Sequence, residues 1–221
     1  MTELDEQYKD AELKVYLAVT NAGKETVKNI AARLSIGGLP VVLDQVIPEL
    51  SPGQTWTGWL TGKVADPRKW DNEHPYLYTM KIELGNADVT TEQIEKRFGF
   101  REVEVQGNRL LVNGKPVKLR GVCRHEAHPL TGRVMTPELE RKDVELYRAA
   151  NCNFIRTSHY PPCEELLEIC EELGMFVEVE APVCWIGHHA NENWKVLDYQ
   201  DSTYYPYVLQ ANMETIHFYR N

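Results

Sequence analysis

The order of the apolar runs between residues 119 and 179 constrains the fold of this chain more than any other feature. Three short runs occur there, at residues 119–123, 154–157 and 175–179, and segments of helical period separate them. Strands that alternate with helices demand a parallel sheet, which is either closed into a barrel or open and doubly wound. The sequence therefore predicts an α/β fold for the second half of the chain.

The helical segments carry start and stop signals. Thr136 followed by Pro137 is a capping hydroxyl before proline at the first helical position, which predicts a helix to about Ala150. Residues 163–173 place apolar side chains on one stripe, and Gly174 is a typical C-terminal cap. A third helix is expected from about residue 205 to 219.

Hydrogen-bonding side chains follow each predicted strand. They are Arg124, His125, Glu126 and His128 after the first strand, Arg156, Ser158 and His159 after the second, and Glu180 after the third. A (β/α)8 TIM barrel collects such strand ends around one mouth, whereas an open sheet gathers them only at its switch point. No GxGxxG follows the first strand, so the barrel is favoured. Only about 120 residues remain from Gly99 to the end of the chain, whereas a whole barrel needs about 250, so we expect at most three of its eight βα units.

The first part of the chain has the two-residue period of half-buried strands. Five runs with this alternation end at turn signals such as Gly37-Gly38 and Pro52-Gly53, which predicts an antiparallel immunoglobulin-like β-sandwich over residues 1–98. From Gly99 two polar turns follow, and Asn113-Gly114 is a strong hairpin signal. We expect this hairpin to introduce the second domain, residues 99–221.

Charge and composition exclude several classes of partner. The net charge is −9 and no run of Lys or Arg occurs, which argues against binding to nucleic acid or to an anionic membrane. No apolar run approaches the roughly 20 residues of a membrane span, and the acidic start MTELDEQYKD is unlike a signal peptide. The compartment of the parent protein, bacterial cytoplasm or periplasm, stays open.

The five cysteines favour free thiols over disulfides or zinc ligands. Their number is odd and no CxxC pair occurs. His125 and His128 are three residues apart, not four as in HExxH, so a metal-dependent hydrolase is a weak alternative. We predict no metal site.

Long ordered motifs in the second half resemble a known family. The segment LRGVCRHEAHPLTGRVM, the run RTSHYPP, the helix end LEICEELG and the strand MFVEVEAP together resemble glycoside hydrolase family 2. That family contains β-galactosidases, β-glucuronidases and β-mannosidases, and the pattern RHExHPLxGxVM is most similar to the β-galactosidase branch. Upstream, KWDNEHPYLY resembles the last strands of the family's central immunoglobulin-like domain.

The resemblance implies a sugar subsite at the strand ends. On the matching positions, His125, Arg156 and His159 are expected to bind the substrate, because buried donors that pair with sugar hydroxyls discriminate strongly against analogues lacking them. Arg124, His128 and Glu180 are expected to support the pocket. The structural alternative is that these polar groups pair with one another and with the loop backbone.

The reaction that the resemblance implies is retaining hydrolysis by two carboxylates about 5 to 5.5 Å apart. The family's acid/base and nucleophile follow later strands, so we expect both beyond Asn221 and none in this chain. The pair Asn191-Glu192 lies in a polar loop and is not expected to be catalytic. Magnesium, known in the family, is not expected, because Cys184 to Gly187 reads CWIG where the family has ExHG.

Two classes of function remain open. The first is a fragment of a retaining β-glycosidase, most similar to β-galactosidases, with β-glucuronidase or another family member as the alternative. The second is a non-catalytic carbohydrate-binding module. In either case the expected partner is a carbohydrate. The truncated barrel leaves a strand edge unpaired and an apolar inner face uncovered, so we expect it to associate with a second copy or to hold its last helices in non-native positions.

Overall fold

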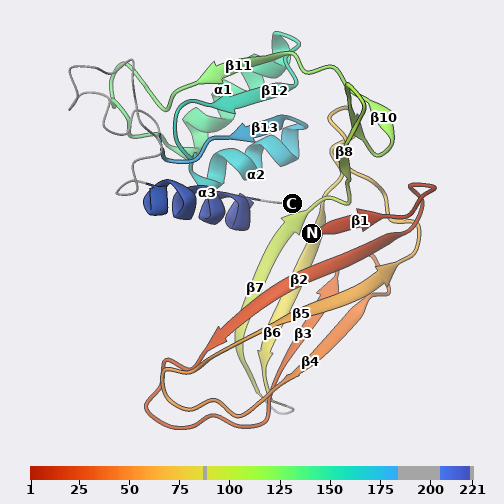
Figure 1. Ribbon diagram of the computed structural model, residues 1–221, viewed down its shortest axis with the longest axis vertical. Helices are drawn as coiled ribbons and strands as arrows, with labels where there is room; N and C mark the ends of the chain where they lie inside the picture. The colour runs from red at the N-terminus through yellow and green to blue at the C-terminus, as the bar shows by residue number, and fades with distance from the viewer. Residues whose placement is uncertain (87–88, 184–204, 220–221) are drawn as a thin grey trace. The chain divides into compact units, whose positions relative to one another are not determined.

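The computed structural model describes residues 1–86, 89–183 and 205–219 and divides into two compact units, Met1–Lys118 and Leu119–Asn221 (Figure 1).

The first unit contains an antiparallel β-sandwich. Its described strands form one sheet in the order β4-β3-β6-β7 and a second in the order β1-β2-β5. The bounds are β1 Thr2–Leu4, β2 Ala11–Thr20, β3 Ile30–Ile36, β4 Val42–Ile47, β5 Thr55–Val64, β6 Tyr78–Gly85 and β7 Thr90–Phe98. The five alternating runs of the sequence are confirmed as β2 to β6, whereas β1 and β7 have little apolar alternation and were not predicted.

Alternating side chains fill the space between the two sheets. Leu13, Leu34 and Leu60 are buried there together with Phe98 and Phe100, whose rings meet edge to face at 5.1 Å. Because the side-chain period of a strand is two, every second residue of these strands joins this core.

A hairpin completes the first unit. Strands β8 (Val103–Gln106), β9 (Arg109–Val112) and β10 (Lys115–Pro116) pair antiparallel. Asn113 and Gly114 both have positive φ, 49° and 73°, which confirms the Asn-Gly turn. The N-terminal segment is tied to this hairpin, since Tyr8 Oη donates to Glu104 Oε2 at 2.6 Å.

The second unit contains the predicted parallel sheet. Strands β11 (Gly121–Arg124), β12 (Phe154–Thr157) and β13 (Phe176–Val179) lie side by side in that order, and both pairings are parallel. The described helices are α1 (Pro137–Ala149), α2 (Glu164–Leu173) and α3 (Tyr205–Tyr219). The predicted caps are confirmed: Thr136 accepts a hydrogen bond from the Leu139 amide, and Gly174 ends α2 at φ 74°.

One polar row crosses this sheet on the face away from the helices. Ile155 of β12 is fully buried against Val144 of α1 and Leu166 of α2. The opposite face carries the in-register row Cys123, Arg156 and Glu178. Parallel pairing thus places an apolar row under the helices and a polar row on the other side.

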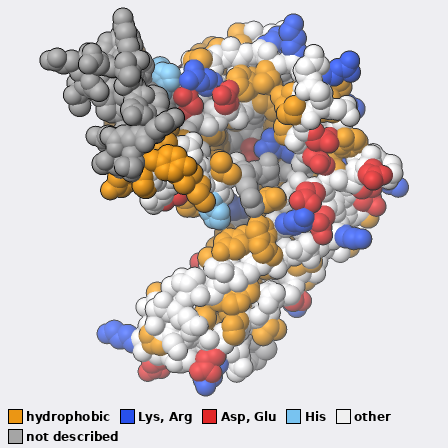
Figure 2. All heavy atoms as spheres, in the orientation of Figure 1, with side chains coloured by type: hydrophobic (Ala, Val, Ile, Leu, Met, Phe, Trp, Pro, Cys, Tyr) orange, Lys and Arg blue, Asp and Glu red, His pale blue; other side chains and the backbone are white. Residues whose placement is uncertain are grey.

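Surface features agree with the composition. On the face shown in Figure 2, acidic and basic side chains are interspersed over the described residues. No helix in the described ranges has the length and apolar character to cross a membrane.

The described cysteines Cys123, Cys152, Cys163 and Cys170 are free thiols, and Cys184 lies outside the described residues.

Candidate functional site

The ends of β12 and β13 bring three predicted site residues into contact. Arg156 Nη2 lies 2.9 Å from each carboxylate oxygen of Glu180, and its hydrogen bond to Oε1 has good geometry. His159 Nδ1 lies 3.4 Å from Arg156 Nη2 and 3.4 Å from Glu180 Oε1. The sequence therefore identified a real cluster, which we call the strand-end cluster: His125, Arg156, His159 and Glu180.

His125 joins this cluster from the end of β11. Its ring meets the His159 ring nearly perpendicularly, with centroids 5.3 Å apart. The His125 ring is exposed, whereas His159 and Arg156 are half-buried. An exposed imidazole next to half-buried hydrogen-bonding groups gives the cluster side chains that can bind hydroxyls.

Cys123 contributes sulfur to the floor of the cluster. Arg156 Nη1 lies 3.6 Å from Cys123 Sγ, on the strand next to it. Hydrogen bonds to Cys123 and Glu180 raise the pKa of Arg156, so its guanidinium is charged throughout the physiological range. Cys123 was not predicted as a site residue, although its position two residues before His125 places both on one side of a strand.

Arg124 points to the opposite side of the sheet. Its guanidinium forms buried ion pairs with Glu140 and Asp143 of α1, and the Arg124 and Glu140 side chains are 2% and 1% exposed. Arg124 thus fixes the end of β11 to α1 immediately before His125. This geometry is compatible with the predicted supporting role, which stays a prediction.

Glu126 fixes the chain on the other side of His125. Its carboxylate accepts a hydrogen bond from the Cys163 amide at 3.2 Å, at the start of α2, and its own amide donates to Tyr160 Oη at 3.1 Å. A carboxylate at a helix N-terminus is favourable because it satisfies an unpaired amide and complements the helix dipole. His125 is therefore held between two anchored neighbours.

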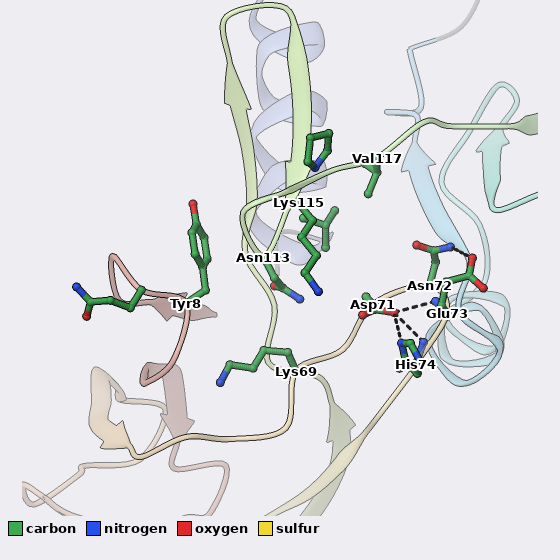
Figure 3. A pocket seen from close by; sticks show the side chains of 12 residues that line it. Tyr8, Lys69, Asp71, Asn72, Glu73, His74, Asn113, Lys115 and Val117 are labelled. Carbon is green, nitrogen blue, oxygen red and sulfur yellow. Dashed lines mark hydrogen bonds and ion pairs between the residues drawn. The ribbon is translucent and has the colours of Figure 1, made fainter.

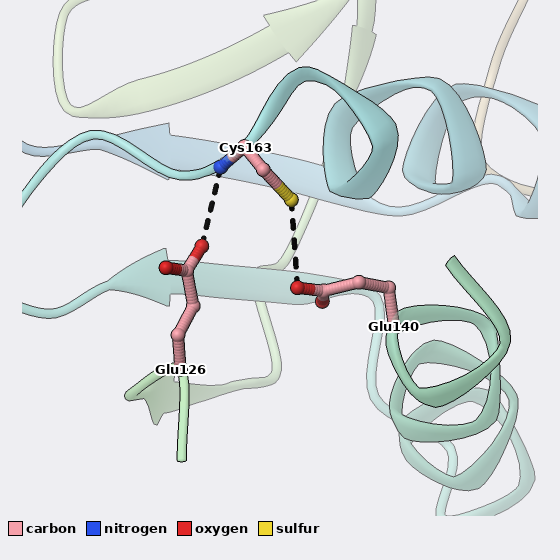
Figure 4. A group of neighbouring side chains, drawn as sticks. All are labelled: Glu126, Glu140 and Cys163. Carbon is pink, nitrogen blue, oxygen red and sulfur yellow. Dashed lines mark hydrogen bonds between the residues drawn. The ribbon is translucent and has the colours of Figure 1, made fainter. Parts of the chain in front are cut away.

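Glu126, Glu140 and Cys163 form a compact group that could in principle hold a metal ion (Figure 4). Their potential ligand atoms lie within 4.8 Å of one another. Burial raises the pKa of the Cys163 thiol to about 11, so the thiol stays protonated and donates to Glu140 Oε1. Because Glu140 also pairs with Arg124, all three groups already have protein partners, and this group fits a structural role.

His128 lies apart from the strand-end cluster. Its amide and carbonyl exchange hydrogen bonds with Gly132, and its ring nitrogen Nδ1 lies 3.2 Å from Thr131 Oγ1. These contacts stabilise the turn that follows β11. Its predicted supporting role is compatible with them and stays a prediction.

Three further predictions fall outside the described residues. They concern the pair Asn191-Glu192, the segment Cys184 to Gly187, and the end of the chain at Asn221. The thiol, indole and aliphatic side chains of Cys184 to Ile186 supply no oxygen ligand for magnesium.

Comparison with known proteins assigns the two halves of the chain to one family. Residues 1–101 match the family model described as glycosyl hydrolases family 2, and residues 103–221 match its TIM barrel domain. The chain belongs to glycosyl hydrolase family 2. The predicted family and the predicted fold, an immunoglobulin-like sandwich followed by part of a TIM barrel, are thereby confirmed.

Curated relatives of this family 2 chain carry two names. A putative β-glucuronidase of Formosa agariphila is 34% identical over 84% of this chain and 22% of its own length. A β-galactosidase of Aeromonas hydrophila is 37% identical over 81% of this chain and 18% of its own length. The chain therefore spans about a fifth of the length of these relatives.

A solved structure of the same family has the same fold. The β-glucuronidase of Bacteroides uniformis superposes with a TM-score of 0.72 at 32% identity, over 80% of this chain and 22% of that protein. The family models meet between residues 101 and 103, and the compact units meet after Lys118. The domain boundary predicted between residues 98 and 99 stays a prediction.

Tyr160 was missed as a site residue. Its ring lies 6.3 Å from that of His125, and the guanidinium of Arg133 lies 5.3 Å from its ring centroid. The available signal was its position directly after His159 in the run RTSHYPP. Nothing in the sequence pattern indicated that Arg133, which is nine residues after Arg124, would reach this ring.

Proposed function

We propose that the protein to which this chain belongs is a retaining β-glycosidase that hydrolyses O-glycosidic bonds, with a β-galactoside as its substrate. In this proposal the chain supplies one wall of the sugar subsite. The carboxylic acid that protonates the leaving oxygen and the carboxylate that attacks the sugar come from outside this chain.

The observation that carries the proposal is the strand-end cluster in a family 2 chain. Arg156 and His159 share the carboxylate of Glu180, and His125 stands against His159. Hydrogen bonds to Glu180 and His159 limit the conformations of Arg156, so less side-chain entropy is lost when a sugar hydroxyl binds. Side chains held in this way position a sugar for attack by groups that other strands carry.

The charge of the cluster favours a neutral sugar. The positive charge of Arg156 is balanced by Glu180 at 2.9 Å. A galactose ring presents only hydroxyl groups, which pair with the donors and acceptors of this cluster without leaving a charge unmatched.

The test combines hydrolysis and binding. The 221-residue chain alone is expected to leave a chromogenic β-galactoside uncleaved. Galactose is expected to shift the His125 and His159 ring resonances in NMR spectra, and Arg156→Gln is expected to weaken this binding about tenfold by loss of a charged hydrogen bond. Arg109→Gln, on an exposed arginine of β9, is the matched control.

Either of two results would contradict the proposal. Hydrolysis by the chain alone would show that the catalytic carboxylates lie within it. If the Arg156→Gln protein and the unchanged protein bind galactose with equal affinity, the strand-end cluster is not part of the sugar subsite.

A β-glucuronidase is the second candidate, and Arg133 favours it. Arg133 is exposed beside Tyr160 and has no carboxylate partner among the described residues. A guanidinium of this kind can bind the carboxylate of a uronic acid. If glucuronate binds more tightly than galactose and Arg133→Gln abolishes the difference, the substrate of the parent enzyme is a glucuronide.

A further inference from the structure

A pocket of about 660 Å³, lined by charged, amide and apolar side chains, opens in the first unit and shares no residue with the strand-end cluster (Figure 3). Its walls come from the turn that contains Gln7 and Tyr8, the loop from Lys69 to His74, and the residues from Val112 to Val117. Its volume lies in the range of about 300–1,000 Å³ typical of small-molecule sites. The proposed function assigns no role to this pocket.

The loop wall of this pocket is held in a fixed shape. Asp71 Oδ1 accepts hydrogen bonds from the amides of Glu73 at 2.9 Å and His74 at 2.7 Å. Asn72 is only 8% exposed, and its side-chain amide donates to Glu73 Oε1 at 2.7 Å. Asn113, in the opposite wall, donates to the carbonyl of Trp70 at 3.0 Å. The pocket therefore exists before a ligand arrives, which reduces the entropic cost of binding.

Several polar groups of the pocket have no partner among the described residues. The ammonium group of Lys115 makes no ion pair with them, and the side-chain carbonyl oxygen of Asn72 accepts no hydrogen bond from them. Asp71 uses Oδ1 for the loop, so Oδ2 is left for a ligand. A cationic donor, an amide acceptor and a carboxylate acceptor thus line one cavity.

The balance of charges defines the class of ligand. The two lysines that line the pocket, Lys69 and Lys115, are equal in number to its two acidic residues, Asp71 and Glu73, so the formal charge of the lining is zero when histidine is counted as neutral. An anion or a cation would meet groups of its own sign. Val117 and the Tyr8 ring add apolar surface, which suits the C–H face of a sugar.

We propose that this pocket is a binding site for a neutral mono- or disaccharide, independent of the catalytic subsite. Lys115 and the Asn72 carbonyl bind hydroxyl groups from opposite walls, and Asp71 Oδ2 accepts a further hydroxyl proton. Such a site would hold a second part of a glycan on the first unit.

The experiment is an NMR titration of the ¹⁵N-labelled 221-residue chain with lactose, and with glucuronate as the charged comparison. Lactose is expected to shift the amides of residues 71–74 and 113–117 to saturation. Lys115→Ala is expected to weaken binding about tenfold, the effect of one charged hydrogen bond. Lys24→Ala, an exposed lysine of the same unit outside the pocket, is the matched control and leaves the affinity unchanged.

Three results would overturn this proposal. They are the absence of saturable shifts at residues 71–74 and 113–117, tighter binding of glucuronate than lactose at those residues, and unchanged affinity in Lys115→Ala. Arg156→Gln distinguishes binding at the two sites. It is expected to weaken the ligand-induced chemical shift changes at the strand-end cluster and to leave those at the pocket unchanged. Absence of galactose binding at the strand-end cluster therefore does not count against the pocket, nor does an empty pocket count against the proposed function.

Discussion

Arg124→Met tests whether the buried ion pair between β11 and α1 holds the end of the first strand. The Arg124 and Glu140 side chains are 2% and 1% exposed, so removal of the arginine leaves a buried carboxylate without its charged partner. Breaking one partner of a buried pair is far more costly than replacing both by apolar residues. Glu140 in the variant escapes this cost by taking up a proton.

The magnitude follows from that proton. Protonating a carboxyl whose ordinary pKa is 4.5 costs about 1.4 kcal/mol for each pH unit above that value. The predicted loss in the free energy of unfolding is therefore about 3 kcal/mol at pH 7 and under about 1 kcal/mol at pH 5. The sign is that of a group whose folded pKa is raised: the stability of the variant is greatest at low pH and falls as the pH rises above 4.5.

Urea unfolding at pH 5 and pH 7 measures this difference. Arg124→Met combined with Glu140→Leu is expected to recover most of the loss at pH 7, because no charge is then left buried. Arg33→Met, which breaks the exposed pair between Arg33 and Asp44, is the control and changes stability little. An Arg124→Met protein that loses the same stability at both pH values would refute the reasoning.

Three further predictions concern the second unit. Burial raises the pKa of the Cys170 thiol from 9.0 to about 12, so its contribution to the free energy of unfolding is complete below pH 9 and falls as the pH rises towards 12. Cys170→Ala should therefore flatten the dependence of urea unfolding on pH in this range, whereas Cys152→Ala, at another free cysteine, should not. Gly174→Ala forces a side chain into φ 74° and should cost about 1–2 kcal/mol in the same assay. The chain should self-associate in sedimentation experiments, because β11 and β13 each lack a second partner strand among the described residues and α3 exposes Tyr207, Met213 and Phe218. A protein that stays monomeric over about a hundredfold range of concentration would contradict this prediction.

The sequence alone located the strand-end cluster but could not describe its contacts. His125, Arg156, His159 and Glu180 were recognisable because each lies at or just after the carboxyl end of a strand of a predicted parallel sheet, where side chains converge. The ion pair between Arg156 and Glu180 depends on the register of β12 and β13, which residues far apart in sequence set together. The contacts of Cys123 with Arg156 and of Tyr160 with His125 likewise join residues far apart in sequence.

Patterns of period two and 3.6, together with Thr136 and Gly174 at the helix ends, determined most of the elements, because local backbone chemistry decides where helices and strands begin and end. The family motifs determined the kind of protein. Tertiary structure decided the rest, including which side of the sheet each arginine faces: Arg124 lies buried against α1, whereas Arg156 lies on the opposite side with Glu180. The pocket beside Lys115 also exists only in the folded chain, because its walls are brought together from three segments by packing that no local pattern encodes.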